Sequence, residues 1–185
     1  MRPIFTVGHS TRTEAEFTAL LTEFGVDTLV DVRTYPGSRH CPWFGRDVMP
    51  GWLDPIGYVH MPALGGRRRN CLEHSPNGWW THPSFRAYAD YAEGDEFAAG
   101  LDELLGLAET HTCAIMCSEA VWWKCHRRII TDYLIAVAHR RVIHIMGPGE
   151  AVDAVANPAG EVEHGSLVYP GAPVPQLGLF DEARP

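Results

Sequence analysis

Short apolar runs alternate along this chain with stretches of helical periodicity. The apolar runs are aliphatic and β-branched, and their length predicts five buried strands, at residues 4–7, 28–32, 58–61, 113–116 and 142–146. Between them, apolar residues recur every three or four positions. This period predicts helices at residues 11–24, two between residues 83 and 107, and one at residues 129–137.

Local signals indicate where these elements end. Thr11 followed by Glu14 predicts a capping box for the first helix, and Gly25 predicts its end. Residues 34–57 hold four prolines and no regular period, which predicts a long loop. From residue 148 to residue 185 the chain is rich in proline and glycine and loses its periodicity, so we expect an irregular C-terminal tail.

The order of strands and helices predicts an α/β fold. Right-handed crossovers between parallel strands place helices on both faces of a sheet, which gives a three-layer α/β/α sandwich around a mainly parallel, doubly wound sheet of five strands. A chain of 185 residues with 45% apolar content is long enough for one core. We therefore expect a single α/β domain over residues 1–147.

Composition excludes several classes of protein. A net charge of −8 at pH 7 argues against a broad surface for non-specific nucleic-acid binding. No apolar run is long enough for a membrane span, and the N-terminus leads directly into a strand, so we expect no signal peptide and a cytoplasmic protein. Five cysteines, an odd number, indicate free thiols, a metal site or catalysis in place of a disulfide framework.

Polar residues and glycines follow each of the first four predicted strands. Because the carboxyl ends of parallel strands meet at one edge of a sheet, these residues are expected to lie together. Open α/β sheets bind their ligands at that edge, so we predict a ligand site there. Its residues are His9 and Ser10, Asp31 and Arg33, Gly65, Gly66 and Arg67, and Cys117 with Glu119.

Two carboxylates at this edge are candidates for catalysis. Glu119 directly follows a strand and precedes a cation-rich loop, so it is a candidate general acid or base, or the group that stabilises a developing positive charge. The structural alternative is an ion pair of Glu119 with Lys124, Arg127 or Arg33. Asp31 is the second candidate, and an internal pairing with Arg33 is an equally good interpretation of it.

Cys117, Cys125 and His126 form a second chemical group. Cys125 and His126 begin a predicted helix, where the helix dipole and adjacent cations favour a thiolate or a bound anion. Both thiols and the imidazole are therefore catalytic candidates. These residues supply only three of the four protein ligands of a closed zinc site, and neighbouring residues seldom bind the same ion. The sequence therefore favours a site without metal over a zinc site. A zinc site would need a further ligand from His9, His40 or Cys41.

Tryptophans lie beside cations in two loops. Trp122 and Trp123 precede Arg127, and Trp79 and Trp80 follow a run of arginines. Flat rings interleaved with cations suit stacking on bases and binding of phosphates. We expect Trp122 and Trp123 to contact a base, and Arg33, Arg67 and Arg127 to contact phosphates. The alternative is that one tryptophan of each pair fills the core.

The tail carries a short peptide with its own signal. Gln176, Leu177, Leu179 and Phe180 form a Gln-Leu-x-Leu-Phe sequence in a proline-rich segment. It is similar to the peptide by which bacterial DNA polymerases and repair proteins bind the sliding clamp. Packing of the peptide on its own domain, or a chance match, is the alternative. Binding to a clamp would supply a high local concentration on DNA without a broad basic surface.

Five motifs occur together in consistent order over roughly residues 3–146. Together they resemble the domain of unknown function 488 family. The resemblance implies an α/β three-layer fold and carries no established reaction. Residues 121–124 replace the family's usual proline-containing loop. The motifs are Gly8-His9-Ser10, Val30-Asp31-Val32-Arg33, Ala63-Leu64-Gly65-Gly66-Arg67, residues 85–91, and Cys117-Ser118-Glu119 with Cys125-His126-Arg127.

Three functional hypotheses follow. The first is a DNA-maintenance enzyme, recruited by the sliding clamp, that acts on a nucleotide or an extruded base; base excision by hydrolysis, with Glu119 or Asp31 stabilising the transition state, is its most concrete form. The second is a thiol or sulfur-transfer enzyme that acts on a small anionic substrate through Cys117 or Cys125. The third is a clamp-bound adaptor that recognises DNA without catalysis.

Overall fold

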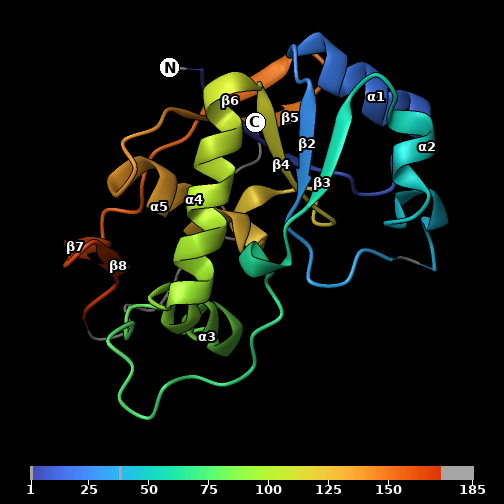
Figure 1. The fold of residues 1–185 in the computed structure, drawn as a ribbon. Helices are drawn as coiled ribbons and strands as arrows, with labels where there is room; N and C mark the ends of the chain where they lie inside the picture. Colours follow the sequence, from blue (N-terminus) through green and yellow to red (C-terminus); the bar gives the residue numbers. More distant parts are fainter. Residues whose placement is uncertain (1, 38, 172–185) are drawn as a thin grey trace.

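A computed structural model describes residues 2–37 and 39–171 of the protein. Six strands form one sheet between two layers of helices (Figure 1). The strand order is β3-β2-β4-β1-β5-β6, and every neighbouring pair is parallel except β5 with β6. The strands are β1 (Ile4–Gly8), β2 (Thr28–Asp31), β3 (Gly57–His60), β4 (Cys113–Cys117), β5 (Val142–Gly147) and β6 (Glu150–Asp153). The predicted fold class is confirmed.

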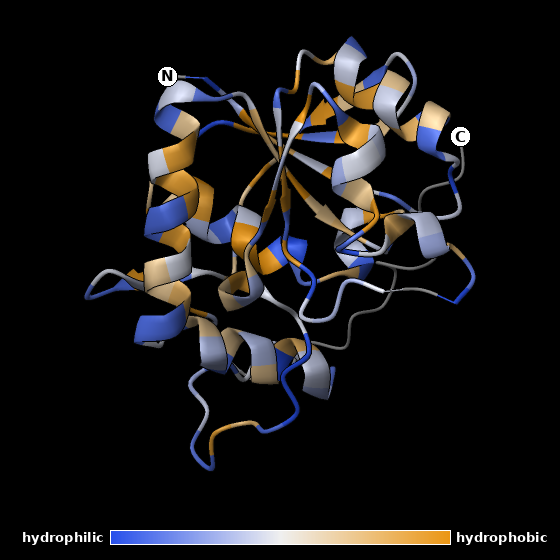
Figure 2. Ribbon diagram, turned by 45° about the vertical axis from the view of Figure 1, so that its right-hand side comes forward, coloured by the Kyte–Doolittle hydropathy of each residue, from blue (hydrophilic) through white to orange (hydrophobic). Residues whose placement is uncertain are grey.

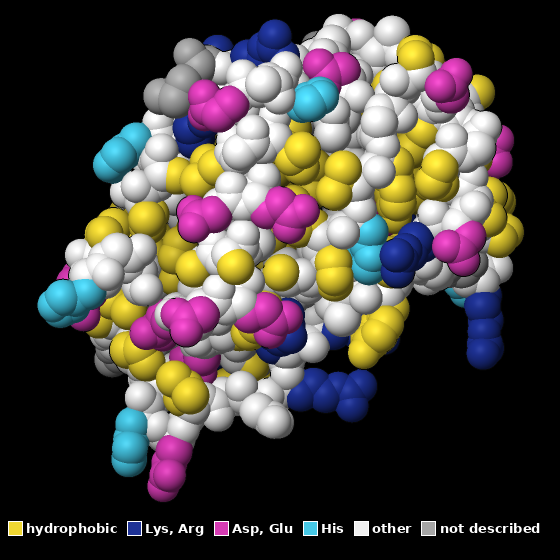
Figure 3. All heavy atoms as spheres, in the orientation of Figure 1, with side chains coloured by type: hydrophobic (Ala, Val, Ile, Leu, Met, Phe, Trp, Pro, Cys, Tyr) yellow, Lys and Arg dark blue, Asp and Glu magenta, His cyan; other side chains and the backbone are white. Residues whose placement is uncertain are grey.

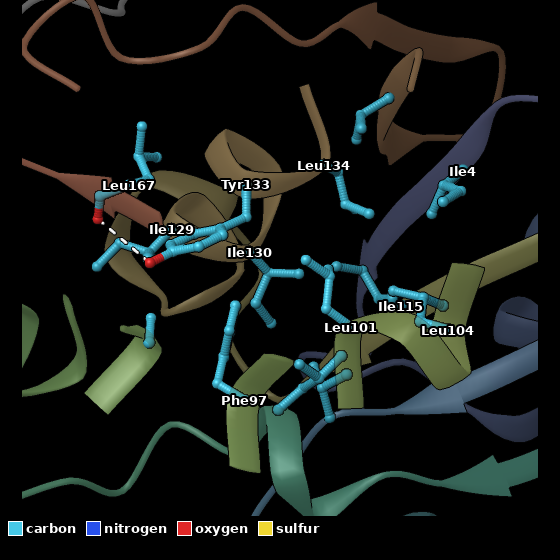
Figure 4. Packing of buried hydrophobic residues seen from close by; sticks show 14 of the residues in the cluster. Ile4, Phe97, Leu101, Leu104, Ile115, Ile129, Ile130, Tyr133, Leu134 and Leu167 are labelled. Carbon is cyan, nitrogen blue, oxygen red and sulfur yellow. Dashed lines mark hydrogen bonds between the residues drawn. The ribbon is translucent and has the colours of Figure 1, made fainter. Parts of the chain in front are cut away.

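Each face of the sheet is covered by its own group of helices. α1 (Glu14–Glu23) and α2 (Met49–Leu53) pack against one face, with Phe17 and Met49 fully buried. The other face carries a larger core from α3 (Pro83–Ala92), α4 (Asp95–Thr110) and α5 (Arg127–Ala136). Figure 4 shows part of it: Phe97 and Leu101 of α4 lie near Ile130 of α5. In Figure 2 the long segment before α3 is mostly hydrophilic.

The first helix begins two residues later than the sequence indicated. Its N-cap is Thr13, whose side chain accepts from the backbone N–H of Glu16 while the Glu16 carboxylate accepts from the Thr13 N–H. The expected box of Thr11 and Glu14 is wrong, because both pairs have the same spacing and only the second is followed by the buried face of the helix. Gly25 ends the helix as predicted, with a φ of 66°.

Two segments that were expected to be irregular contain regular structure. Between β2 and β3 lie a 3-10 turn (Pro42–Phe44) and the short helix α2. After residue 147 the chain turns back as β6 and then forms a hairpin of β7 (Glu161–Glu163) and β8 (Ser166–Val168). All four residues of β6 are exposed, so this strand has no apolar side and gave no alternating signal. The Gln176–Phe180 peptide lies outside the described residues.

β1 and β4 lie side by side at the centre of the sheet, and the chain leaves them in opposite directions. After β1 it passes through α1 on one face to reach β2, whereas after β4 it passes through α5 on the other face to reach β5. Such a reversal opens a crevice between the two carboxyl ends. The backbone hydrogen bonding between β1 and β4 continues beyond the end of β1, since the His9 N–H donates to the Cys117 carbonyl over 2.9 Å.

A buried polar cluster holds the long segment that precedes α3. Asp90 of α3 is 7% exposed, and its carboxylate accepts from the Leu72 N–H and the Asn77 amide, each over 2.8 Å. Ser75 donates to the same carboxylate. The side-chain oxygen of Asn77 in turn accepts from the Tyr169 N–H over 2.9 Å. One carboxylate therefore ties this segment to the body of the protein and, through Asn77, to the chain after β8.

Replacement of Asp90 tests this cluster. Asp90→Ala leaves the buried Asn77 amide and the Leu72 N–H without their acceptor, and we expect the free energy of unfolding to fall by about 1–3 kcal/mol. Urea denaturation followed by circular dichroism measures the change. Glu103→Ala, at an exposed position of the neighbouring α4, is the matched control and should stay within about 0.5 kcal/mol. Equal effects of the two substitutions would contradict the interpretation.

Candidate functional site

A cavity of about 570 Å³ lies at the carboxyl edge of the sheet, beside the crevice between β1 and β4. The loops after β1, β2 and β4 line it, together with residues 66–67 and the start of α3 and α5. Cavities of this size hold small molecules or single nucleotides. The predicted site residues on its wall are His9, Arg33, Gly66, Arg67, Cys117, Glu119, Cys125 and His126.

A buried ion pair supports one wall of the cavity. Asp31 has no exposed surface, and its carboxylate accepts from the Arg33 backbone N–H and, through both oxygens, from the Arg33 guanidinium at 2.9 and 2.6 Å. The Tyr58 hydroxyl donates to the same carboxylate over 2.8 Å. The internal pairing that the sequence left open for Asp31 is therefore present, and Asp31 does not line the cavity. It positions Arg33, which does.

His9 is held in one orientation by its two ring nitrogens. Nδ1 lies 2.9 Å from the Ser10 carbonyl, to which it donates, so Nε2 is the acceptor for the Arg33 guanidinium at 3.1 Å. The ring stacks on Phe44 with centroids 4.1 Å apart. Burial, and then the charge of Arg33, lower the pKa of His9 from 6.5 to about 4. His9 thus presents a neutral imidazole at neutral pH.

Cys125 is held by the residue two positions further along the chain. Its sulfur accepts from the Arg127 backbone N–H at 3.5 Å and from the Arg127 Nε at 3.4 Å. The other end of the same guanidinium donates to the backbone carbonyl of Glu119. Arg127 is 1% exposed and does not line the cavity, so it joins the two loops from within.

The thiols of Cys117 and Cys125 converge on the imidazole of His126. The Nε2–H of His126 donates to the Val32 carbonyl over 2.9 Å, which leaves the lone pair on Nδ1. Nδ1 lies 3.5 Å from the Cys125 sulfur and 3.9 Å from the Cys117 sulfur. Residues nine positions apart in the chain therefore form one cluster on the cavity wall.

The two thiols of this cluster differ in acidity. The hydrogen bond to Cys125, and then burial, raise the pKa of Cys117 to about 12. Burial also acts to raise the pKa of Cys125, but the hydrogen bond from Cys117 and the charge and N–H groups of Arg127 outweigh it and lower the pKa to about 6. Cys125 is therefore the thiolate of the pair, and Cys117 is its hydrogen-bond donor.

Two glycines allow the close approaches on which the site depends. A Cβ at Gly8 would lie in contact with the backbone carbonyl of Glu119, so only glycine lets the end of β1 pass beneath the loop after β4. A Cβ at Gly66 would collide with Nδ1 and Cγ of His126. The absence of a side chain at this position lets the imidazole ring lie against the backbone.

Charged and aromatic side chains surround the mouth of the cavity. Arg67 and Lys124 are exposed cations on its wall, and Glu119 is an exposed carboxylate. The Arg67 guanidinium lies 5.9 Å from the centre of the Tyr35 ring, which is 72% exposed. Phe85 lies behind, stacked on the buried Trp80. In Figure 3, acidic side chains lie over the region of α4, while basic side chains project from the lower right of the molecule.

Several residues that were expected at the site lie outside the cavity. Trp122 stacks on His144 of β5 with ring centroids 4.3 Å apart, and Trp123 packs edge-on against Trp122. Neither ring lines the cavity, and the same holds for Ser10, Gly65 and Arg127. The alternative interpretation of the other tryptophan pair is confirmed, because Trp80 is 1% exposed and fills the core.

The structure adds wall residues that were not among the predicted site residues. Tyr88 is fully buried within α3, and its hydroxyl donates to the Leu64 carbonyl over 2.7 Å. His82 is the N-cap of the same helix. The start of α3 reaches the site only because the segment before it folds back across the edge of the sheet. No local sequence pattern predicts the course of that segment. The added residues are Thr34, Tyr35, Gly37, His82, Ser84, Phe85, Tyr88, Ser118 and Lys124.

These features define an α/β protein of the doubly wound type with a ligand-sized cavity at the point where its strand order reverses. The chain belongs to the family described as Domain of unknown function DUF488, whose model matches residues 13–134. That match runs from the cap of α1 into α5 and so includes the Asp31–Arg33 pair and the cluster of Cys117, Cys125 and His126. No curated protein and no solved structure is significantly similar to the chain.

The environment of His9 predicts a pH dependence of stability. A histidine in the unfolded chain takes up its proton near pH 6.5, whereas folded His9 does so near pH 4. The unfolded chain therefore binds more protons between these values, and stability falls as the pH is lowered through that window. His9→Gln should reduce the loss between pH 7 and pH 5 by on the order of 1–2 kcal/mol, measured by urea denaturation at both pH values.

The control for this experiment is His74→Gln, at an exposed position of the segment before α3, which should leave the pH dependence unchanged. A wild-type His9 resonance that titrates near pH 6.5 in NMR spectra would contradict the assignment. His144 has a pKa lowered to about 3 by burial and then by Arg127, so part of the pH dependence persists in the His9 variant.

Proposed function

We propose that this protein is a hydrolase that acts on a nucleotide, or on a base extruded from DNA, bound in the cavity at the carboxyl edge of the sheet. The observation that carries the proposal is the composition of the cavity wall. In a chain with a net charge of −8, the exposed cations Arg67 and Lys124 stand at the mouth of one hollow, and Arg33, whose charge is balanced by Asp31, lies on its wall. This concentration of positive charge against the overall balance favours an anionic ligand.

The aromatic part of the wall suits a planar ring. Tyr35 stands at the mouth near Arg67, and Phe85 and Tyr88 lie deeper. Enzymes that act on a nucleobase hold it by stacking and by hydrogen bonds to its edge while cations hold the phosphates. Ser118 adds a hydroxyl on the same wall, beside the ring of His9, whose two nitrogens are bound to the Ser10 carbonyl and to Arg33.

Glu119 is the group to which we assign proton transfer. It follows β4 on the wall of the cavity, where its exposed side chain is accessible to a ligand. In base excision a water oxygen bonds to C1′ of the sugar and the bond from C1′ to the base nitrogen breaks. The proton that water gives to Glu119 passes to the departing base, so the products are a free base and a sugar with a new hydroxyl.

The sliding-clamp peptide belongs to this proposal. Its support is the sequence of Gln176, Leu177, Leu179 and Phe180 near the C-terminus. Binding to a ring that encircles DNA would raise the local concentration of the cavity at its substrate, and the protein would not need a basic surface of its own. A cytoplasmic location follows from the same role.

A panel of duplexes, each carrying one damaged or mismatched base, tests the reaction. The wild-type chain should release a free base from at least one duplex, and Glu119→Gln should lower that rate by about a hundredfold or more. Arg67→Ala should weaken binding of the same duplex by about tenfold. Glu103→Ala, on the exposed side of α4, serves as the control and should keep both rate and affinity.

Absence of any released base across the panel, with duplex binding intact, would instead support an adaptor that recognises DNA without changing it. A Glu119→Gln variant with the wild-type rate would remove Glu119 from the reaction.

A second candidate is thiol or sulfur-transfer chemistry on a small anionic substrate. The observation that favours it is the position of Cys125 on the cavity wall, with its sulfur bound by two N–H groups of Arg127. A nucleophilic Cys125 would form a covalent adduct with its substrate. Mass spectrometry of the intact protein during turnover distinguishes the two reactions, because base hydrolysis as proposed leaves no adduct on the sulfur.

Deletion of residues 176–180 tests recruitment. The full chain should retain purified sliding clamp in a pull-down, and the deleted chain should lose that retention. A chain in which Leu179 and Phe180 are both replaced by alanine is the finer test, since it removes the apolar anchors without shortening the tail. Unchanged retention after the deletion would remove clamp binding from the proposal.

A further inference from the structure

We infer that Cys117, Cys125 and His126 form a zinc site whose fourth ligand is a water molecule in the cavity. The inference deepens the proposed hydrolytic function and rests on it for the role of the metal. The presence of the site itself rests on the arrangement of three side chains. Among the described residues, their ligand atoms, two sulfurs and one imidazole nitrogen, all lie within 4.8 Å of one another.

The distances match those of a tetrahedral zinc site. With Zn–S bonds of about 2.3 Å and a Zn–N bond of about 2.0 Å, tetrahedral angles place sulfur and nitrogen roughly 3.6 Å apart. Nδ1 of His126 lies 3.5 Å from the Cys125 sulfur and 3.9 Å from the Cys117 sulfur. Both sulfur–nitrogen distances therefore lie within a few tenths of an ångström of those around a bound ion, and the two sulfurs lie within 4.8 Å of one another.

Backbone geometry explains how two successive residues can bind one ion. Cys125 is extended, with φ −138° and ψ 153°, whereas His126 has the helical values −58° and −18°. The chain turns between them at the start of α5, and this turn brings the two side chains to the same side. The objection that neighbours seldom share a metal, which the sequence alone raised, is met by this turn.

Outer contacts hold the three ligands in the form that a metal requires. The Val32 carbonyl accepts the Nε2–H of His126 and so directs the lone pair of Nδ1 toward the sulfurs. The two N–H groups of Arg127 reach the Cys125 sulfur, as expected for a bound thiolate. At Gly66, the missing side chain leaves room for the imidazole ring itself, since a Cβ there would collide with Nδ1 and Cγ of His126.

The fourth ligand comes from the cavity. Among the described residues, none of the three further candidates, His9, His40 and Cys41, joins the cluster: the Cys41 sulfur lies 3.7 Å from the Ser10 carbonyl, to which it donates, and His9 is bound by Arg33. All three inferred ligands line the cavity, as does Glu119. Three protein ligands with an open position are typical of catalytic zinc sites, where zinc lowers the pKa of its bound water. The zinc-bound water would then be a proton source for Glu119, which lies on the same cavity wall.

The zinc site also bears on the two candidate reactions. With both sulfurs bound to the ion, neither remains available as a nucleophile, so an occupied site favours hydrolysis over thiol chemistry.

Metal analysis of the full-length protein tests the inference. The chain, purified without added chelator and under reducing conditions, should hold about one zinc per chain, measured by inductively coupled plasma mass spectrometry. Cys117→Ser, Cys125→Ser and His126→Ala should each lose most of it. Cys71→Ser, at an exposed thiol outside the cluster, is the matched control and should keep the metal. Circular dichroism establishes that each variant is folded.

Cobalt substitution gives a readout that survives if a ligand variant does not fold. The wild-type chain with Co²⁺ should show the visible absorption of tetrahedral cobalt and the near-ultraviolet bands of cobalt bound to thiolate. Gly66→Ala should weaken zinc binding by about tenfold, because the new methyl group would collide with the imidazole ring of His126 and displace Nδ1. Arg127→Lys, which removes the Nε–H that reaches the Cys125 sulfur, should likewise weaken zinc binding.

Three results would overturn the inference: no more zinc on the wild-type chain than on Cys125→Ser after titration and gel filtration, cobalt spectra without thiolate bands, or iron or copper in place of zinc. None of them depends on the substrate, so a failed metal site and a failed hydrolytic function are told apart by metal content on the one hand and by the panel of duplexes on the other.

Discussion

The ion pair between Asp31 and Arg33 is the interaction on which the site depends. Removing two charges from water is costly, and burial is tolerated only when the pair is well aligned and the remaining polar atoms are satisfied. Here the carboxylate accepts four hydrogen bonds, three from Arg33 and one from Tyr58. Arg33 in turn orients His9 and donates to the Phe44 carbonyl over 2.8 Å. One buried carboxylate thus fixes the loop after β1, the loop after β2 and the turn that precedes α2.

A second centre, Arg127, organises the opposite wall in the same manner. Its guanidinium links the Cys125 sulfur to the Glu119 carbonyl, and Gly8 lets β1 lie directly beneath that carbonyl. The two buried arginines therefore hold the loops of the site together through hydrogen bonds within the protein. A ligand would contact the side chains that these two arginines hold on the cavity wall, together with the exposed Arg67, Lys124 and Glu119 at the mouth.

Much of this arrangement was predictable from the sequence, because a parallel sheet converts order along the chain into position along one edge. His9, Arg33 and Glu119 each follow a strand, Cys117 ends one, and all four side chains line one cavity. The contribution of α3 was not predictable, since it depends on a long segment tied down by Asp90, and such a tie has no periodic signal. Trp122 was misplaced for a related reason: its partner is His144, a buried residue on a strand that comes later in the chain. Contacts between residues this far apart in the chain leave no local pattern in the sequence.

The antiparallel strand β6 has a consequence for how the molecules behave at high concentration. A sheet margin with unpaired backbone groups is a template on which further chains can add. β6 is only four residues long, with all four exposed, and the carboxylate of Asp153 at its end is paired with Arg141. Two such margins brought together could share only a four-residue ladder. The last strand of the sheet therefore discourages fibre-like stacking of one copy upon the next.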